Sequence, residues 1–415
     1  MGAFIFISTM QNTVLFLLIV TFLTNCSTPK KSPEISVNTT KIHVNLDKAN
    51  PIHMSNVFSD IHYFYLKSPS DRPIGRIWKV MVRDNYVALY DRSRKSVWVY
   101  TLGGKYVNEV KIPEGRGPGE LTDINDVIFT KNHNIYALGN FKIVGYKLDN
   151  SFLEEVDFHF RLYRFTYDNS TKSFISYASN SINEARSDNV HAGDNLIFLN
   201  KEGNITKSIL PIPKAKAQIS YGIPNNFPTY KDQQLFISHL NDTVYTIKAN
   251  KAIPKYILDY GEHAIPKGVF KLRKKYSENI HRWTNFMEKE ITDNEYVTYL
   301  SYFDETDSYL YFRIGTGKKS FNVLYNKESK KTSITPNKMI NDIDYGVTSY
   351  MYEAHANALY TVIGSNKLIN HLNDLYKNHP SKYQDPRTKE LIKLANLIDA
   401  NRNPILMVAT FKDSK

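Results

Sequence analysis

Short apolar runs separated by turn residues dominate the chain from about residue 34 onward. Residues 77–82, 86–90, 96–100 and 106–110 form four such runs, and the pair Gly103-Gly104 separates the last two. Runs of this length, rich in Val, Ile and Tyr, are typical of β-strands. Four strands joined by tight turns predict a meander, which is the content of one blade of a β-propeller.

The same unit recurs along the rest of the chain. The further runs are residues 134–138, 143–148, 196–200, 234–238, 243–247, 309–313, 321–325 and 358–362. Turn residues follow them at intervals of about 50 residues, a period typical of propeller blades. We therefore predict an all-β fold, a six-bladed β-propeller over residues 35–415, in which residues 35–66 supply a closing strand.

A longer gap between the predicted blades contains a helical pattern near residues 264–291. Pro266 stands near its start, where a proline fits the first turn of a helix. Apolar residues follow at spacings of three and four, namely Val269, Leu272, Tyr276, Ile280, Trp283 and Met287. This stripe would pack against the propeller. The alternative is that the helix, which is rich in Lys and Arg on its other face, lies on an anionic membrane surface.

A second helical insertion is predicted near residues 366–400. Its first part carries an amphipathic set, namely Leu368, Ile369, Leu372 and Leu375. Asp385-Pro386 is typical of an N-cap followed by the first residue of a helix. The apolar run after Asn403-Pro404 predicts a strand of the last blade, and we expect the helices on one rim of the propeller.

The charge of the chain is strongly basic, with 53 Lys and Arg against 41 Asp and Glu and a net charge of +12. Residues 1–29 carry no charge, so the whole excess lies in the later part of the chain. Such an excess favours anionic membranes, acidic glycans or nucleic acid as partners. Nucleic acid is a poor partner for an exported protein, and the basic residues are widely spread. A solvated basic surface is therefore the simpler interpretation.

Cys26 is the only cysteine, and it follows an uncharged apolar segment. A segment of about ten apolar residues matches the h-region of an export signal and is too short to span a membrane. The sequence Leu23-Thr24-Asn25-Cys26 resembles the lipobox of bacterial lipoproteins, in which the cysteine accepts the lipid. We therefore predict lipid attachment at Cys26. The alternative is a free cysteine buried at the end of a membrane anchor.

Processing at Cys26 would divide the chain into a signal peptide of residues 1–25, a tether of residues 26–34 and the propeller. The tether is polar and contains prolines, so we expect it to be extended. Lys30 and Lys31 occupy positions where acidic residues often direct such lipoproteins to the cell surface. We therefore predict an outer-membrane lipoprotein that faces the periplasm.

The loop at residues 114–121, with the sequence EGRGPGEL, resembles the G-x-G-P-G-E signature of six-bladed β-propeller lipoproteins of Bacteroidetes, relatives of NHL-repeat propellers. Further stretches are similar to that family in content and order, namely residues 60–66, 74–77, 241–245 and 403–412. The resemblance covers residues 35–412. It implies a propeller fold and a location in the cell envelope, but no established reaction and no catalytic residues.

The signature loop has two interpretations of its own. Arg116, Gly117, Gly119 and Glu120 would form an anion-binding nest, since glycines expose backbone N–H groups. The loop is not a dinucleotide fingerprint, because Pro118 breaks that pattern and no helix follows. The alternative is a tight connection between blades, in which Arg116 and Glu120 hold the loop in place.

Searches for catalytic motifs find little. The sequence has no H-E-x-x-H and no G-x-S-x-G, and its twelve His are scattered without ligand spacing. Acidic clusters at residues 123–126, 304–307 and 342–344 do not fit the Ca²⁺-loop pattern, so we interpret them as solvated turns. We expect no cofactor and no metal site.

Two classes of function remain. We favour a binding or scaffolding module over an enzyme, because loops from every blade line one end of a propeller's channel. Its partner would be a glycan, a peptide or an envelope protein. The alternative is a metal-dependent hydrolase or lyase with its site at the channel mouth, which rests on analogy of fold alone.

Overall fold

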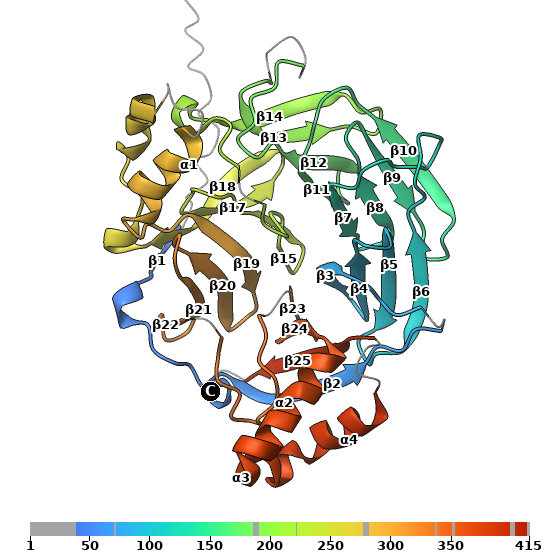
Figure 1. Ribbon diagram of the computed structural model, residues 1–415. Helices are drawn as coiled ribbons and strands as arrows, with labels where there is room; N and C mark the ends of the chain where they lie inside the picture. Colours follow the sequence, from blue (N-terminus) through green and yellow to red (C-terminus); the bar gives the residue numbers. More distant parts are fainter. Residues whose placement is uncertain are drawn as a thin grey trace, which may run out of the picture. The chain divides into compact units, whose positions relative to one another are not determined.

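Six β-sheets arranged around a common axis form the folded body of the protein (Figure 1). The computed structural model describes residues 39–412 except 70–71, 186–190, 221, 277–281, 337, 351–352 and 399–402. The sheets belong to the compact unit Asn38–Lys415, and the unit Met1–Val37, with Cys26 in it, lies outside the described residues. The prediction of a six-bladed β-propeller is confirmed.

Each blade is an antiparallel sheet of four strands, named here from the axis outward. The first blade contains β3 (Ile77–Arg83), β4 (Tyr86–Asp91), β5 (Ser96–Thr101) and β6 (Tyr106–Lys111). The second contains β7 (Asp126–Phe129), β8 (Ile135–Leu138), β9 (Lys142–Tyr146) and β10 (Phe152–Asp157). The third contains β11 (Arg164–Asp168), β12 (Ser173–Tyr177), β13 (Asp194–Leu199) and β14 (Ile205–Pro211).

The other three blades follow the same order. The fourth contains β15 (Thr229–Tyr230), β16 (Gln233–Phe236), β17 (Thr243–Lys248) and β18 (Lys251–Asp259). The fifth contains β19 (Tyr299–Glu305), β20 (Tyr309–Gly315), β21 (Ser320–Asn326) and β22 (Thr332–Pro336). The sixth contains β23 (Glu353–His355), β24 (Ala358–Ile363), β25 (Ile405–Phe411) and, as its outer strand, β2 (Phe58–Tyr65).

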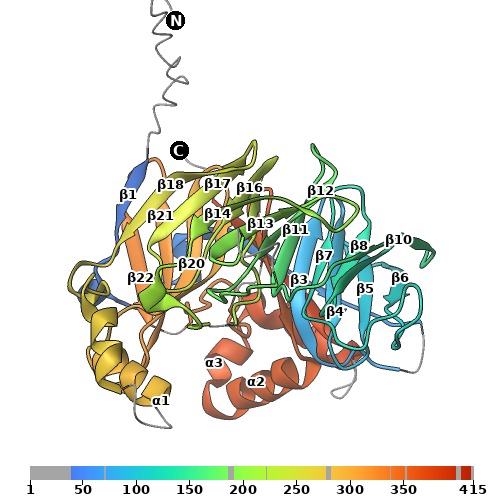
Figure 2. The ribbon, with the colours of Figure 1, turned by 90° about the horizontal axis from the view of Figure 1, so that it is seen from above.

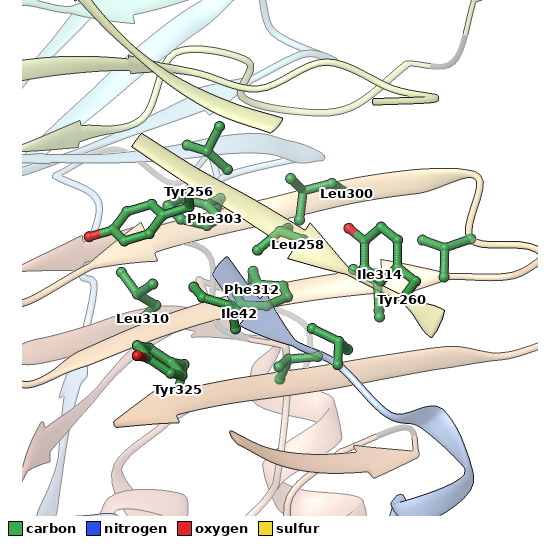
Figure 3. Packing of buried hydrophobic residues seen from close by; sticks show 14 of the residues in the cluster. Ile42, Tyr256, Leu258, Tyr260, Leu300, Phe303, Leu310, Phe312, Ile314 and Tyr325 are labelled. Carbon is green, nitrogen blue, oxygen red and sulfur yellow. The ribbon is translucent and has the colours of Figure 1, made fainter. Parts of the chain in front are cut away.

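The middle strands are buried along almost their whole length, because each blade packs against both of its neighbours. Their sequences are therefore continuous apolar runs rather than alternating ones, as in other sheets that are covered on both faces. Figure 3 shows the contact between the fourth and fifth blades, where Leu258 lies among Phe303 and Phe312. The hydrophobic core thus lies between the blades.

The ring is closed by a strand from the N-terminal part of the chain. β2 pairs antiparallel with β25, from Phe58 opposite Phe411 to Tyr65 opposite Ile405, which confirms the predicted closing strand. A second N-terminal strand, β1 (Thr40–His43), was not predicted. It extends the fourth blade as a fifth strand, parallel to β18.

The two ends of the propeller differ in the connections that they carry. The tight turns within blades, such as Asp84-Asn85 and Ala249-Asn250, lie at one end, which we call the turn face. The connections between successive blades, and those between the second and third strand of a blade, lie at the other end, the insertion face. Since β18 starts at the turn face and β1 runs parallel to it, the described chain enters from the turn face (Figure 2).

The insertion between β18 and β19 is not the single helix that the sequence predicts. It consists of a 3₁₀ segment η5 (Val269–Tyr276), a short helix α1 (Arg282–Phe286) and a π-helical turn η6 (Met287–Thr292). The buried residues include the neighbours Val269 and Phe270, and Phe286 and Met287, together with Ile291. Adjacent buried positions do not fit one narrow stripe of a straight helix, and the segment therefore breaks. These side chains pack against Ile219 and Leu240 of the propeller, which agrees with the interpretation that the apolar stripe faces the propeller.

The second insertion agrees with its prediction. It contains α2 (Ser365–Asn378), α3 (Pro380–Tyr383), η7 (Pro386–Thr388) and α4 (Lys389–Leu397). Leu368, Leu372 and Leu375 are buried against the sixth blade. The Asp385 side chain accepts a hydrogen bond from the Arg387 N–H, as an N-cap does. Figure 2 shows α1, α2 and α3 on the same side of the blades, the insertion face.

Short 3₁₀ turns complete the described elements. They are η1 (Leu46–Lys48), η2 (Met54–Asn56), η3 (Lys214–Lys216) and η4 (Gly261–His263).

Candidate functional site

The inner strand of each blade has one edge without a neighbour in its own sheet, so its N–H groups need other acceptors. Carboxylates on the inner strands of adjacent blades supply them. Asp126 accepts from Phe165 N at 3.3 Å, and Asp304 accepts from Ala354 N at 2.9 Å. These inter-blade carboxylates join successive blades around the axis.

Lys79 and Asp126 form a buried ion pair between the first and second blades. Lys79 Nζ lies 2.9 Å from Asp126 Oδ1, and the two side chains are only 6% and 2% exposed. Lys79 Nζ also donates to the Val127 carbonyl at 3.0 Å. The pair is hydrogen-bonded on both sides, which is the condition under which buried charges are tolerated.

Arg83, Glu353 and Asp304 form a second buried cluster, which joins the first, sixth and fifth blades. An Arg83 guanidinium nitrogen lies 3.0 Å from Glu353 Oε1. Burial raises the pKa of Glu353, and the charge of Arg83 opposes this rise. Burial, together with the charge of Glu353, raises the pKa of Asp304 well above its usual range. Among the described residues, Asp304 Oδ2 is buried without a hydrogen-bond partner, so the site favours the protonated form of Asp304.

The signature loop lies in the connection from β6 to β7 and contacts β9 and β10. Its predicted binding residues are Arg116, Gly117, Gly119 and Glu120. Gly117 N donates to Glu120 Oε2 at 2.9 Å, and Gly119 N donates to Glu155 Oε2 at 2.7 Å. Lys142 Nζ lies 2.9 Å from Glu155 Oε2 and also donates to the Gly117 carbonyl. The N–H groups that an external anion would bind are therefore engaged by carboxylates of the chain itself.

Replacing Glu155 by alanine is expected to lower the free energy of unfolding by about 1–3 kcal/mol, since its carboxylate binds both an ammonium group and a backbone N–H. Arg116→Ala is the matched control. Arg116 is exposed and forms none of the ion pairs found in the described ranges, so we expect a change within about 0.5 kcal/mol. Urea unfolding measures both variants, and an equal loss in both would show that Arg116 also holds the loop.

His239 lies in a buried polar network between the third and fourth blades. Its Nε2 lies 2.7 Å from the Ile219 carbonyl, which only accepts, so Nε2 carries the proton and Nδ1 accepts from Tyr177 O–H at 3.2 Å. Burial, with a smaller contribution from the charge of Lys216, lowers the pKa of His239 to about 4. The imidazole is therefore neutral at neutral pH.

The acidic clusters of the sequence have different roles in the structure. Asp126 and Asp304 are buried inter-blade carboxylates, so the interpretation of their clusters as solvated turns is wrong for these two residues. Asp342 instead accepts from Ser55 N at 2.9 Å in a surface connection. In the part of the chain that the structure describes, no group of three or more His, Cys, Asp or Glu side chains is arranged to hold a metal ion.

The sequence alone did not single out Lys79, Arg83 or Glu353. A signal was present for Lys79, which is the charged residue within the apolar run 77–82. A lysine in a buried strand needs a buried partner. That partner, Asp126, lies 47 residues further along the chain, and only the arrangement of the blades brings the two together.

These features define a six-bladed β-propeller that is held together at its axis by buried charges and extended by insertions on one face. The chain belongs to the family described as "Domain of unknown function (DUF4934)", whose model matches residues 37–410. No curated protein matches the chain.

Solved structures of low sequence identity resemble the chain. A protein of Bacteroides fragilis described as exported has a TM-score of 0.72 and 16% identity, over 90% of this chain and 100% of that chain. A member of the DUF4221 family from Bacteroides vulgatus has a TM-score of 0.44 and 9% identity, over 86% of this chain and 97% of that chain. The WD40 domain of Pan2 from Neurospora crassa has a TM-score of 0.37 and 9% identity, over 75% and 80% of the two chains. The first of these supports the propeller fold.

Among the residues that the structure describes, none of the helices combines the length and the apolar character that crossing a membrane requires.

Proposed function

We propose that the protein is an envelope lipoprotein, attached to the outer membrane by a lipid on Cys26 and facing the periplasm, whose propeller serves as a ligand-binding or protein-interaction scaffold. The export-like segment before Cys26 supports this proposal. So does the likeness of the chain to a Bacteroides fragilis protein described as exported. The relation to NHL-repeat propellers is part of the same proposal.

The observation that carries the proposal is the opposite placement of the chain entry and the insertions. β1 starts from the turn face, whereas α1, α2 and α3 lie on the insertion face (Figure 2). Residues 26–38 would span at most about 45 Å when fully extended. A lipid anchor before β1 would hold the propeller through a chain that enters its turn face, and the insertion face would then be free to bind a partner.

Ion pairs at the turn face also favour the insertion face as the binding surface. Lys131 of the second blade lies 2.5 Å from Asp232 of the fourth blade, so this pair reaches past the third blade. Lys231 of the fourth blade lies 2.9 Å from Asp307 of the fifth. These exposed pairs contribute little to stability, but they draw the turns together around the axis. A glycan, a peptide or an envelope protein would therefore bind at the other end.

Replacing Cys26 by alanine is expected to move most of the protein from the membrane fraction to the soluble fraction, because the lipid acceptor is lost. Fractionation of cells, with mass spectrometry of the N-terminal peptide, measures this change. Ser27→Ala, one residue further on, is the matched control and should leave the protein in the membrane fraction. A Cys26→Ala protein that stays in the membrane fraction as the wild type does would contradict lipid anchoring.

The alternative of a metal-dependent hydrolase or lyase receives no support from a particular observation. Metal analysis of the purified protein would test this alternative directly.

A further inference from the structure

Two basic side chains lie over one aromatic ring on the insertion face, at the junction of the fifth and sixth blades, and a third lies beside one of them. Arg313 belongs to β20, Lys338 follows β22, and Lys367 lies in the first turn of α2. The Arg313 guanidinium carbon lies 3.7 Å from the centroid of the Tyr350 ring, and Lys338 Nζ lies 5.7 Å from it. We call Arg313, Lys338, Lys367 and Tyr350 the basic cluster.

The charges of the basic cluster are not compensated. In the described ranges, none of its three cations forms an ion pair with Asp or Glu. Some half-buried cations of this chain are paired, as Lys255 and Lys327 both bind Glu305, at 2.8 and 2.7 Å. Others, such as Arg164 and Lys216, donate to backbone carbonyls instead. The basic cluster differs from both groups because three such cations lie close together.

Two further observations show that the cluster lacks hydrogen-bond acceptors. The Nε of Arg313 is buried and has no hydrogen-bond partner among the described residues. Burial, followed by the charge of Lys338, lowers the pKa of Lys367, whose ammonium group donates to the Thr348 carbonyl at 3.3 Å. Like charges held this close destabilise the folded protein unless an anion joins them.

The start of α2 adds to the positive potential at the same place. Lys367 lies in the first turn of this 14-residue helix, whose N-cap, Gly364, offers no side-chain acceptor. The N-terminal end of a helix carries a partial positive charge, so a lysine there is unfavourable and an anion is favourable. No acidic residue occupies this first turn. The sequence thus places a cation where a helix normally carries an acidic or capping residue.

We propose that Arg313, Lys338 and Lys367 form a binding site for an oxyanion group, a sulfate, phosphate or carboxylate carried by the ligand of the insertion face. The two lysines donate to the oxyanion, the Arg313 guanidinium adds its positive charge, and Tyr350 packs against the part of the ligand next to it. This inference rests on the proposed binding function and adds the charge of the ligand to it.

The test is calorimetric titration of the folded protein with inorganic phosphate, inorganic sulfate, and a sulfated disaccharide beside its desulfated counterpart. We expect millimolar or tighter binding of at least one oxyanion, and at least tenfold weaker binding by the K338A/K367A double variant. Stronger binding of the sulfated disaccharide than of free sulfate would identify a glycan source, and equal binding would identify the free ion.

The matched control is K318A/K319A, which removes the same charge from the same face. Lys318 and Lys319 are already paired, with Asp293 at 3.4 Å and Glu295 at 3.1 Å, so we expect less than a twofold change in affinity. The unfolding temperature distinguishes a loss of binding from a loss of folding. Removing two lysines that repel each other should leave the unfolding temperature of K338A/K367A unchanged or raise it. Removing the two paired lysines in K318A/K319A should not raise it.

Equal affinity of the two double variants, or no binding of any of these probes to the wild type, would overturn the oxyanion site. The binding function itself is tested separately on a glycan and peptide array. If wild type and K338A/K367A bind an array ligand equally, the scaffold function is supported and the oxyanion site is rejected. If the wild type binds more strongly, and only to anionic ligands, both the scaffold function and the oxyanion site are supported.

Discussion

Replacing Lys79 by methionine is expected to lower the free energy of unfolding by about 3–5 kcal/mol, which is the usual cost of removing one partner of a buried ion pair. Methionine has a similar length and fills the same space, so the loss reports the charge rather than a cavity. Asp126, whose side chain is 2% exposed, would remain as a buried carboxylate that keeps only its backbone N–H donors. Urea unfolding followed by circular dichroism measures the change.

Two controls make this prediction specific. Lys131→Met removes a pair whose side chains are 60% and 82% exposed, and it should leave the free energy of unfolding nearly unchanged. The double variant K79M/D126N removes both buried charges and should recover part of the loss. If K79M cost no more than K131M, the pair between the first and second blades would not hold the ring together.

Acidification from pH 7 to pH 5 is expected to destabilise the protein by about 2 kcal/mol through His239 alone. The pKa of His239 is about 4 in the folded protein, below the usual value of 6.5 that the unfolded chain has. Between these two values the unfolded chain binds more protons, so stability falls as the pH falls. Above pH 6.5 both states are neutral, and the full stability is present.

The His239→Gln variant should lose this part of the pH dependence, whatever its stability at pH 7. Glutamine keeps an N–H donor for the Ile219 carbonyl and does not titrate. His379, an exposed histidine between α2 and α3, gives the control His379→Gln, which should keep the wild-type pH dependence. The measurement is the unfolding free energy at several pH values between 4.5 and 7.5. Parallel curves for wild type and His239→Gln would refute the assignment.

Much of the fold could be predicted because its strands are local features. The run 77–82 is a strand, the turns follow within a few residues, and the closing strand within 35–66 is present as β2. Strand β1 could not be predicted from the sequence. Its partner lies far along the chain, as the hydrogen bond from Thr39 to the Pro254 carbonyl shows, 215 residues apart. Four residues carry too little pattern to indicate such a pairing.

The candidate sites were harder to predict, because they depend on the order of the blades around the axis. The buried partners of Lys79 and Arg83 come from the second and the sixth blade, and nothing close in sequence points to them. The loop at residues 114–121 could be recognised because its three glycines lie close together in the sequence. The structure then showed that Glu155, from β10, engages the Gly119 N–H, which the local sequence cannot reveal.

Strand β1 has a mechanical consequence for a protein that is held by its N-terminus. A pull on the chain before Thr39 reaches β1 before it reaches β2, the strand that closes the ring. Because β1 lies parallel to β18, such a force acts along the strand and loads its hydrogen bonds together rather than one by one. Lys41 and His43 both lie 2.9 Å from Asp259 and add to this attachment. The fifth strand of the fourth blade thus relieves the closing strand of strain.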